Sequence, residues 1–262
     1  MATERTLRAG PTGRGSPVQV GETPGTGQPG SRSYGIPVVA LLASSTALTL
    51  AVRSDGPLPG EVAAARWMNG NTPAAVDRFA ELIDPVLTDT AAPVAFVAIL
   101  LLVWWRWGRH PAVMLGLAGA CTGLTRLGDL VNRPRPTPTV EWSGYSFGNG
   151  GYPSGHVVFS VLVLGTVAML ARRHATSRVA ALIVGSMSLL IAVTSWARVS
   201  RLEHWPLDVV GGSLMAAAGL LGIIWLHPRL ASLASRRPLL GRLLLPPAGP
   251  PTPSTNRRPE ED

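Results

Sequence analysis

The chain has 262 residues and a formal net charge of +8, yet only 15% of its residues are charged and 46% are hydrophobic. This composition, with its long uncharged stretches, makes a soluble globular domain the less favoured class and is typical of a polytopic membrane protein. All 23 basic residues are arginine, because the chain contains no lysine.

The two ends of the chain differ in composition from its middle. Residues 1–33 and 227–262 are rich in Gly, Pro, Ser and Arg and show little apolar periodicity, so we expect disordered tails there. The first apolar run starts too far into the chain for a standard signal peptide and is predicted to be a membrane helix. The membrane domain is therefore expected over 34–226.

Six apolar stretches follow one another in this domain. Three of them hold 20, 19 and 18 uncharged residues, close to the roughly 20 that a membrane-spanning helix needs: 33–52, 179–197 and 209–226. The other three hold 16, 15 and 15 residues and must borrow flanking residues to span: 90–105, 111–125 and 157–171. The sequence therefore predicts an all-α fold, a bundle of six transmembrane helices.

The arginines are distributed unequally between the two sets of loops that six helices create. The tails and the turns 106–110 and 172–178 contain 15 arginines and 5 acidic residues, whereas the other loops contain 8 arginines and 10 acidic residues. The positive-inside rule then places both termini in the cytoplasm and the remaining loops outside it, as in a bacterial plasma membrane protein. The net positive charge reflects this topology, so nucleic-acid binding is not expected.

Two histidines belong to the extracytoplasmic loops. His156 ends the motif "YPSGH" at the start of an apolar run, and His204 stands four residues before Asp208 in "RLEHWPLDVV". A His and an Asp so spaced can hydrogen-bond, which fixes the tautomer of the imidazole and raises its nucleophilicity. A helix N-cap flanked by an interfacial histidine explains the second stretch equally well.

Arginines accumulate on the same side of the membrane. Arg133 and Arg135 lie on a Pro-rich segment, and Arg198 ends the fifth helix. Guanidinium groups match phosphate oxygens in geometry and charge. Ser154 is placed to cap the fourth helix, and Gly155 lets the backbone approach an anion at the helix N-terminus. Together these residues predict a phosphate pocket that contains a nucleophile.

These motifs resemble those of the type 2 phosphatidic acid phosphatase superfamily. Its signature is a Lys, six residues and Arg-Pro; then Pro-Ser-Gly-His; then Ser-Arg, five residues, His, three residues and Asp. The second part is intact at 153–156, and the Ser of the third part is replaced by Ala197. The rest of the third part is present with the family's spacing: Arg198, His204 and Asp208. The resemblance covers roughly 85–226, the motif-bearing core.

The first motif departs further from the family pattern and allows two registers. If Arg135-Pro136 closes the motif, the lysine position falls on Gly128. If Arg133-Pro134 closes it, that position falls on Arg126, a natural substitute in a chain without lysine. We favour Arg135 as the motif arginine and keep Arg126 as a candidate phosphate ligand.

The resemblance implies hydrolysis through a phosphohistidine, without a metal or another cofactor. His204 would attack phosphorus, Asp208 would orient and charge it, and His156 would protonate the leaving oxygen. The phosphate-binding residues would be Arg135, Arg198, Ser154, Gly155 and Arg126. The expected substrate is a membrane lipid phosphate or diphosphate, of the phosphatidate or polyprenyl diphosphate type, because the motif loops lie at headgroup level.

Two other functions are compatible with the same residues. His156, His204 and Asp208 could form a two-histidine, one-carboxylate metal site, although the neighbouring arginines would repel a cation. Alternatively, the incomplete first motif marks a catalytically impaired protein that binds or transports lipid phosphates.

Overall fold

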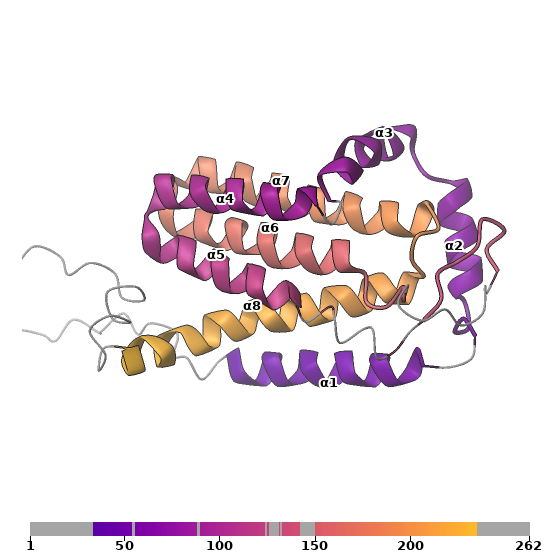
Figure 1. The fold of residues 1–262 in the computed structure, drawn as a ribbon, viewed down its shortest axis with the longest axis horizontal. Coiled ribbons are helices and arrows are strands. Elements are labelled where there is room, and N and C mark those ends of the chain that lie inside the picture. The colour runs from indigo at the N-terminus through magenta and orange to yellow at the C-terminus, as the bar shows by residue number, and fades with distance from the viewer. Residues whose placement is uncertain are drawn as a thin grey trace, which may run out of the picture. The chain divides into compact units, whose positions relative to one another are not determined.

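The structure is a computed structural model that describes residues 34–53, 56–87, 90–123, 125, 131, 133–141 and 150–234, with the backbone alone for 227–234. This part of the chain is all-helical (Figure 1). Its elements, in chain order, are α1 (Gly35–Ala51), α2 (Glu61–Gly70), α3 (Ala74–Ile83), the 3-10 helix η2 (Asp84–Val86), α4 (Ala91–Trp107), α5 (Arg109–Cys121), α6 (Gly155–His174), α7 (Ser177–Ser200) and α8 (Pro206–Ala234). The tail 1–33 and residues 235–262 lie outside it.

Three helices of the described part are long and apolar enough to cross a membrane: α6, α7 and residues 206–226 of α8. A fourth span arises if Ala74–Val86 and Ala91–Trp107 are counted as one broken span; the chain bends by 88° between these two segments. The prediction of an all-helical membrane protein is thus confirmed. The count of six spans stays a prediction, because α1, α4 and α5 have only 17, 17 and 13 residues. The backbone of α8 continues to Ala234, past the boundary at 226 that the apolar pattern predicts.

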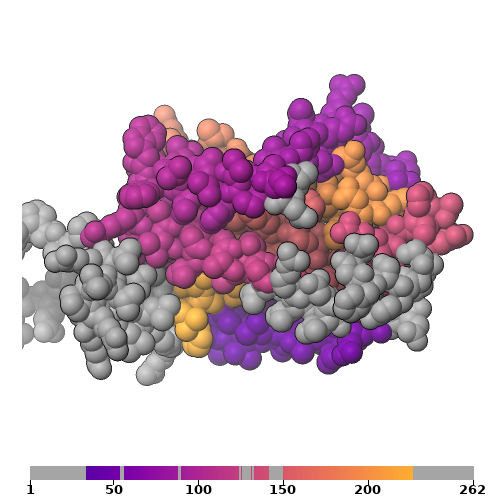
Figure 2. All heavy atoms as spheres, viewed as in Figure 1, coloured from indigo at the N-terminus to yellow at the C-terminus, as the bar shows by residue number. Residues whose placement is uncertain are grey.

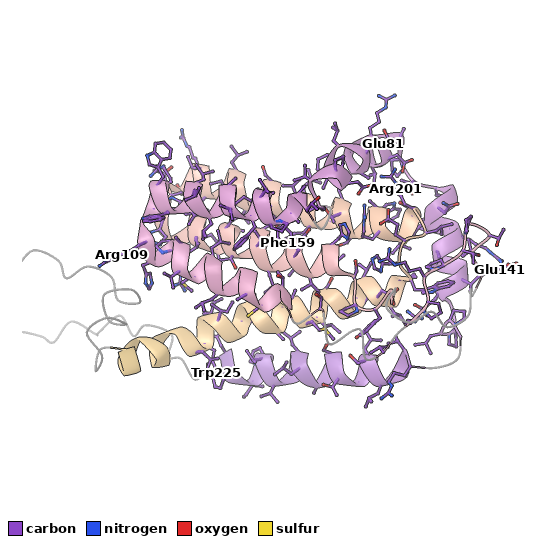
Figure 3. All side chains as sticks on the ribbon, in the orientation of Figure 1. Glu81, Arg109, Glu141, Phe159, Arg201 and Trp225 are labelled. Atoms are coloured by element: carbon purple, nitrogen blue, oxygen red, sulfur yellow. The ribbon has the colours of Figure 1, made fainter. Side chains whose placement is uncertain are left out.

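Many apolar side chains lie on the outside of this bundle. Leu182 and Leu189 of α7 are 71% and 64% exposed, and Trp105 of α4 is 82% exposed. Water would make such exposure unfavourable by about 25 cal/mol per Å² of apolar surface, a penalty that lipid removes. Figure 3 shows Glu81, Glu141 and Arg201 at the end of the bundle beside α2 and α3, and Arg109 at the opposite end. An apolar band between two charged ends is the pattern of a membrane domain.

Helix α6 occupies the centre of the packing. It contacts α5, α7 and α8, and in Figure 2 the side chains of α4 and α5 cover much of it. Its buried Val163 and Leu170 pack with Leu115 of α5, and its buried Leu162 packs with Ala216 of α8. Consequently the N-terminus of α6, where Gly155 and His156 lie, is fixed between neighbouring helices.

Two short helices, α2 and α3, were not predicted. Each has 10 residues of mixed polarity, so neither produces a long apolar run. Helix α2 follows Gly60, whose φ of +89° is the left-handed conformation that glycine adopts most easily. Ala65 of α2 packs with Val199 and Trp205, at the junction between α7 and α8. This packing brings the start of α2 to the start of α8.

Tyr152 packs directly against the backbone of α8. Its ring is buried, and its hydroxyl forms a 2.9 Å hydrogen bond with that of Thr49 on α1. A Cβ added to Gly211 would lie 2.6 Å from the Tyr152 hydroxyl oxygen and 2.7 Å from Cζ. Because Gly211 has no Cβ, Tyr152 can pack closely against α8, and this contact fixes the loop that leads into residues 153–156.

We expect Gly211→Ala to lower the midpoint of thermal unfolding in detergent micelles, by the equivalent of about 1–3 kcal/mol, because Tyr152 has to move. Gly185→Ala in α7 is the matched control: an added Cβ there meets nothing within 4 Å. That change should leave the midpoint unchanged or raise it slightly, since alanine favours the helix. Equal midpoints for the two variants would contradict this account of Gly211.

Candidate active site

The predicted functional residues that the structure describes gather at one end of the bundle, the end beside α2 in Figure 1. Successive long helices run in opposite directions, so the start of α6, the end of α7 and the start of α8 meet there. Residues 133–136 and 150–154 lead through the same region. Segments that are 50 or more residues apart in the sequence thus contribute to one site.

Asp208 connects these segments. It is fully buried in the first turn of α8, where a negative charge is favourable. Oδ1 accepts a 2.6 Å hydrogen bond from Arg133, Oδ2 accepts a 2.8 Å bond from the Trp205 amide, and its carbonyl accepts a 3.1 Å bond from the Ser154 amide. Both carboxylate oxygens are therefore engaged.

His204 is oriented by a backbone carbonyl. Its imidazole is buried, and Nδ1 lies 2.6 Å from the carbonyl oxygen of Gly151 but 3.8 Å from Oδ2 of Asp208. A carbonyl can only accept, so Nδ1 is the donor in this contact; in the neutral imidazole, the lone pair is then on Nε2. The direct His204–Asp208 hydrogen bond expected from the spacing is not formed. Asp208 instead provides a negative charge close to the ring.

Arg133 is a buried cation that holds two carboxylates. Besides Asp208, it forms an ion pair with Glu61 on α2, whose side chain is 3% exposed. Glu61 also accepts hydrogen bonds from the amides of Leu58 and Leu207, at 2.7 and 3.2 Å. Burial lowers the pKa of Arg133, but its bonds with the two carboxylates outweigh burial and raise that pKa above the ordinary value. Arg133 thus secures Asp208 in place.

Arg135 has the opposite orientation to Arg133. It is exposed, and a Cβ added to Gly151 would lie 3.3 Å from its Cγ. The intervening Pro134 is held by a 3.0 Å hydrogen bond from the Trp205 indole to its carbonyl. The choice of Arg135 as the motif arginine stays a prediction; Arg126 and Gly128 lie outside the described residues.

Arg198 ends α7 with its side chain only 4% exposed. One terminal nitrogen forms an ion pair with Glu203 and the other with Asp84 of η2. Its Nε has no hydrogen-bond partner among the described residues. Arg198 therefore keeps one buried donor for a further ligand, and neither carboxylate partner was predicted.

Ser154 and His156 flank the N-terminus of α6. Ser154 occupies the cap position, but its buried hydroxyl forms no cap bond and no other hydrogen bond within the described part. His156 is half-buried, beside a cavity of about 200 Å³. The cavity is also lined by Leu87, Ala92, Thr122, Thr125, Gly155 and Phe159. The first amides of α6, which have no intrahelical acceptor, add donors suited to an anion.

These side chains fit an anion better than a metal ion. Among the described residues, no three His, Cys, Asp or Glu side chains are placed to share a metal ion. Both oxygens of Asp208 accept hydrogen bonds, one of them from Arg133. The donors that remain for a ligand, from Arg198 and Ser154, are those that bind phosphate oxygens.

Comparison with known proteins agrees with this chemistry. The profile of the PAP2 superfamily matches residues 107–232. The Escherichia coli (strain K12) protein YbjG, named an undecaprenyl-diphosphatase, is 31% identical over 145 residues, which are 50% of this chain and 68% of YbjG. The chain belongs to the PAP2 superfamily.

A solved PAP2 structure has the same fold. The crystal structure of the first transmembrane PAP2 type phosphatidylglycerolphosphate phosphatase from Bacillus subtilis superimposes with a TM-score of 0.60. The match covers 74% of this chain and 96% of that chain, at 17% identity. Together with the apolar helices, this places the present PAP2 protein in the membrane as an integral protein.

Two charged residues of the site lie outside the PAP2 profile. Glu61 and Asp84 precede residue 107, and they reach Arg133 and Arg198 across 72 and 114 residues. The PAP2 motifs therefore could not reveal them. The available signal for Glu61 was local: an acidic residue directly after Gly60, in the first turn of a short helix.

Proposed function

We propose that this PAP2 protein is a membrane phosphatase that hydrolyses the terminal phosphate of a lipid through a phosphohistidine. The observation that carries the proposal is the 2.6 Å contact between Nδ1 of His204 and the Gly151 carbonyl. It leaves Nε2 as the nucleophilic atom, in a site that also contains Arg198, Ser154 and His156.

In the first step, Nε2 of His204 attacks phosphorus and the bond from phosphorus to the leaving oxygen breaks. His156 supplies the proton that the leaving oxygen needs, and Asp208 balances the positive charge of the phosphorylated imidazole. In the second step, His156 takes a proton from water, whose oxygen attacks phosphorus while the bond from phosphorus to Nε2 of His204 breaks. This step releases inorganic phosphate and restores the free imidazole. Arg135 and Arg198 stabilise the charge on the phosphoryl oxygens in both steps.

The position of the site supports a lipid substrate. It lies where α6 and α8 begin and α7 ends, which is the level of lipid headgroups if these helices cross the membrane. The names of YbjG and of the Bacillus subtilis enzyme refer to an undecaprenyl diphosphate and a phosphatidylglycerolphosphate. Both are lipids with a terminal phosphate, and we propose this class as the substrate.

The direct test is phosphate release by the purified full-length protein from undecaprenyl diphosphate, phosphatidate and phosphatidylglycerolphosphate. We expect release from at least one of them, and the same rate after treatment with EDTA, because the proposed chemistry uses only protein groups.

Two other results would favour a metal-dependent hydrolase or a lipid-binding protein over the proposed phosphatase. Activity that disappears with EDTA and returns with an added divalent metal would identify a metal-dependent hydrolase. Binding of all three lipids without release of phosphate would identify a binding or transport protein.

The extracytoplasmic position of the site is tested by cysteine labelling in a Cys121→Ser background. Glu141 and Arg109 lie at opposite ends of the bundle (Figure 3). We expect a membrane-impermeant maleimide to label Glu141→Cys in intact cells and Arg109→Cys only after permeabilisation, because the arginine-rich turns should be cytoplasmic. The reverse pattern would invert the orientation.

A further inference from the structure

A single carboxylate joins two arginines at the edge of the site. Oδ1 of Asp84 forms an ion pair with Arg198, and Oδ2 of the same side chain forms one with Arg201. Asp84 and Arg201 are 29% and 31% exposed, whereas Arg198 is almost fully buried. Arg201 lies in the variable five-residue spacer of the third PAP2 motif and is not one of its signature residues.

The geometry of this contact is one that phosphate can reproduce. A carboxylate and a phosphate both present pairs of oxygens to the fork of a guanidinium group. Both terminal nitrogens of Arg198 are already engaged by Asp84 and Glu203. A phosphate that takes the place of one of these carboxylates, on the side of the guanidinium group that faces it, has to displace that carboxylate.

Asp84 is the carboxylate that can leave more easily. Glu203 is held beside Arg198 by the backbone, since its amide donates a 3.1 Å hydrogen bond to the Arg198 carbonyl. Asp84 comes from η2, a separate element that follows α3. Both side chains are partly exposed, 29% for Asp84 and 32% for Glu203, so water can solvate either charge when its ion pairs break. The backbone contact of Glu203 with Arg198 therefore makes the difference between them.

Asp84 also adjoins the proposed phosphate site. It forms an ion pair with Arg198, which we propose as a phosphate ligand. Leu87 and Ala92, which follow η2 in the chain, line the cavity beside His156. An anionic group of the substrate that approaches Arg198 would therefore meet the carboxylate of Asp84.

We propose that Arg201 is an additional phosphate-binding residue and that Asp84 competes with the substrate for the position between Arg198 and Arg201. This inference rests on the proposed function and deepens it. Arg198 and Arg201 together accommodate the second phosphate of a diphosphate lipid, whereas a monophosphate needs only the motif residues. The site is therefore suited to diphosphate substrates.

The test measures binding of inorganic pyrophosphate and inorganic phosphate to the full-length protein in detergent micelles by titration calorimetry. Asp84→Asn removes the competing charge with almost no change of shape, and we expect it to tighten pyrophosphate binding about five- to tenfold. Arg201→Gln should weaken pyrophosphate binding about tenfold and phosphate binding by less than twofold. The matched controls are Asp77→Asn and Arg78→Gln, which change exposed residues of α3.

Each outcome decides the inference separately from the proposed function. Unchanged pyrophosphate binding in Asp84→Asn would show that Asp84 does not compete with the anion, and weaker binding would show that Asp84 supports the site. Equal losses for both anions in Arg201→Gln would remove the preference for diphosphates. Either result overturns the inference even if the wild type releases phosphate from lipids. A wild type that releases no phosphate, but whose Asp84→Asn variant binds pyrophosphate more tightly, would overturn only the catalytic proposal.

Discussion

Replacement of His204 by alanine is expected to abolish phosphate release, with a loss in kcat on the order of 10⁴ or more, because the variant lacks the proposed nucleophile. Because Nδ1 is engaged with the Gly151 carbonyl, Nε2 is the ring nitrogen left for the proposed attack on phosphorus. With a ³²P-labelled substrate, the wild type should accumulate an acid-labile phosphoprotein and His204→Ala should not. His110→Ala, at the opposite end of the bundle, is the control and should behave as the wild type.

The companion variant His156→Ala separates the two histidines. It removes the proton donor but not the nucleophile, so a substrate with a good leaving group, such as p-nitrophenyl phosphate, should still phosphorylate His204. Turnover should then stop at the phosphoprotein, since the same histidine activates water in the second step. Wild-type activity in His204→Ala would disprove the mechanism, and an acid-labile phosphoprotein in that variant would assign the nucleophile to another residue.

The sequence predicted the membrane class and the gathering of the motif residues because both follow from simple rules. Apolar runs mark the long helices, and helices that alternate in direction bring the start of α6, the end of α7 and the start of α8 to one end. The sequence could not predict which carboxylates pair with Arg133 and Arg198. Glu61 and Asp84 lie in short helices of mixed polarity, and their ion pairs depend on tertiary packing alone.

The relation between His204 and Asp208 shows why spacing alone was insufficient. Side chains four residues apart face each other within a helix, but α8 begins at Pro206, after His204. The turn before the helix directs the carboxylate of Asp208 to the amide of Trp205, and the imidazole finds a carbonyl partner in Gly151. The spacing thus brought His204 and Asp208 near each other, whereas the hydrogen bond between them is not formed.

The two arginines of the first motif should differ sharply in their effect on stability. Arg133→Gln leaves the buried carboxylates of Glu61 and Asp208 without their cation, and we expect about 3–5 kcal/mol of destabilisation. Arg135→Gln changes an exposed side chain and should alter stability by less than about 0.5 kcal/mol. Thermal unfolding of both variants in the same detergent measures this difference.

Arg135→Gln and Arg133→Gln should also differ in how their loss of activity relates to their stability. Arg135→Gln should fold normally yet lose about 10²–10³ in kcat/KM, because a charge that stabilises the phosphoryl oxygens is gone. In Arg133→Gln, lost activity should accompany lost stability, and adding Glu61→Gln should recover part of the stability by removing one unpaired buried charge. A stable but inactive Arg133→Gln beside a fully active Arg135→Gln would reverse the assignment and make Arg133 the motif arginine.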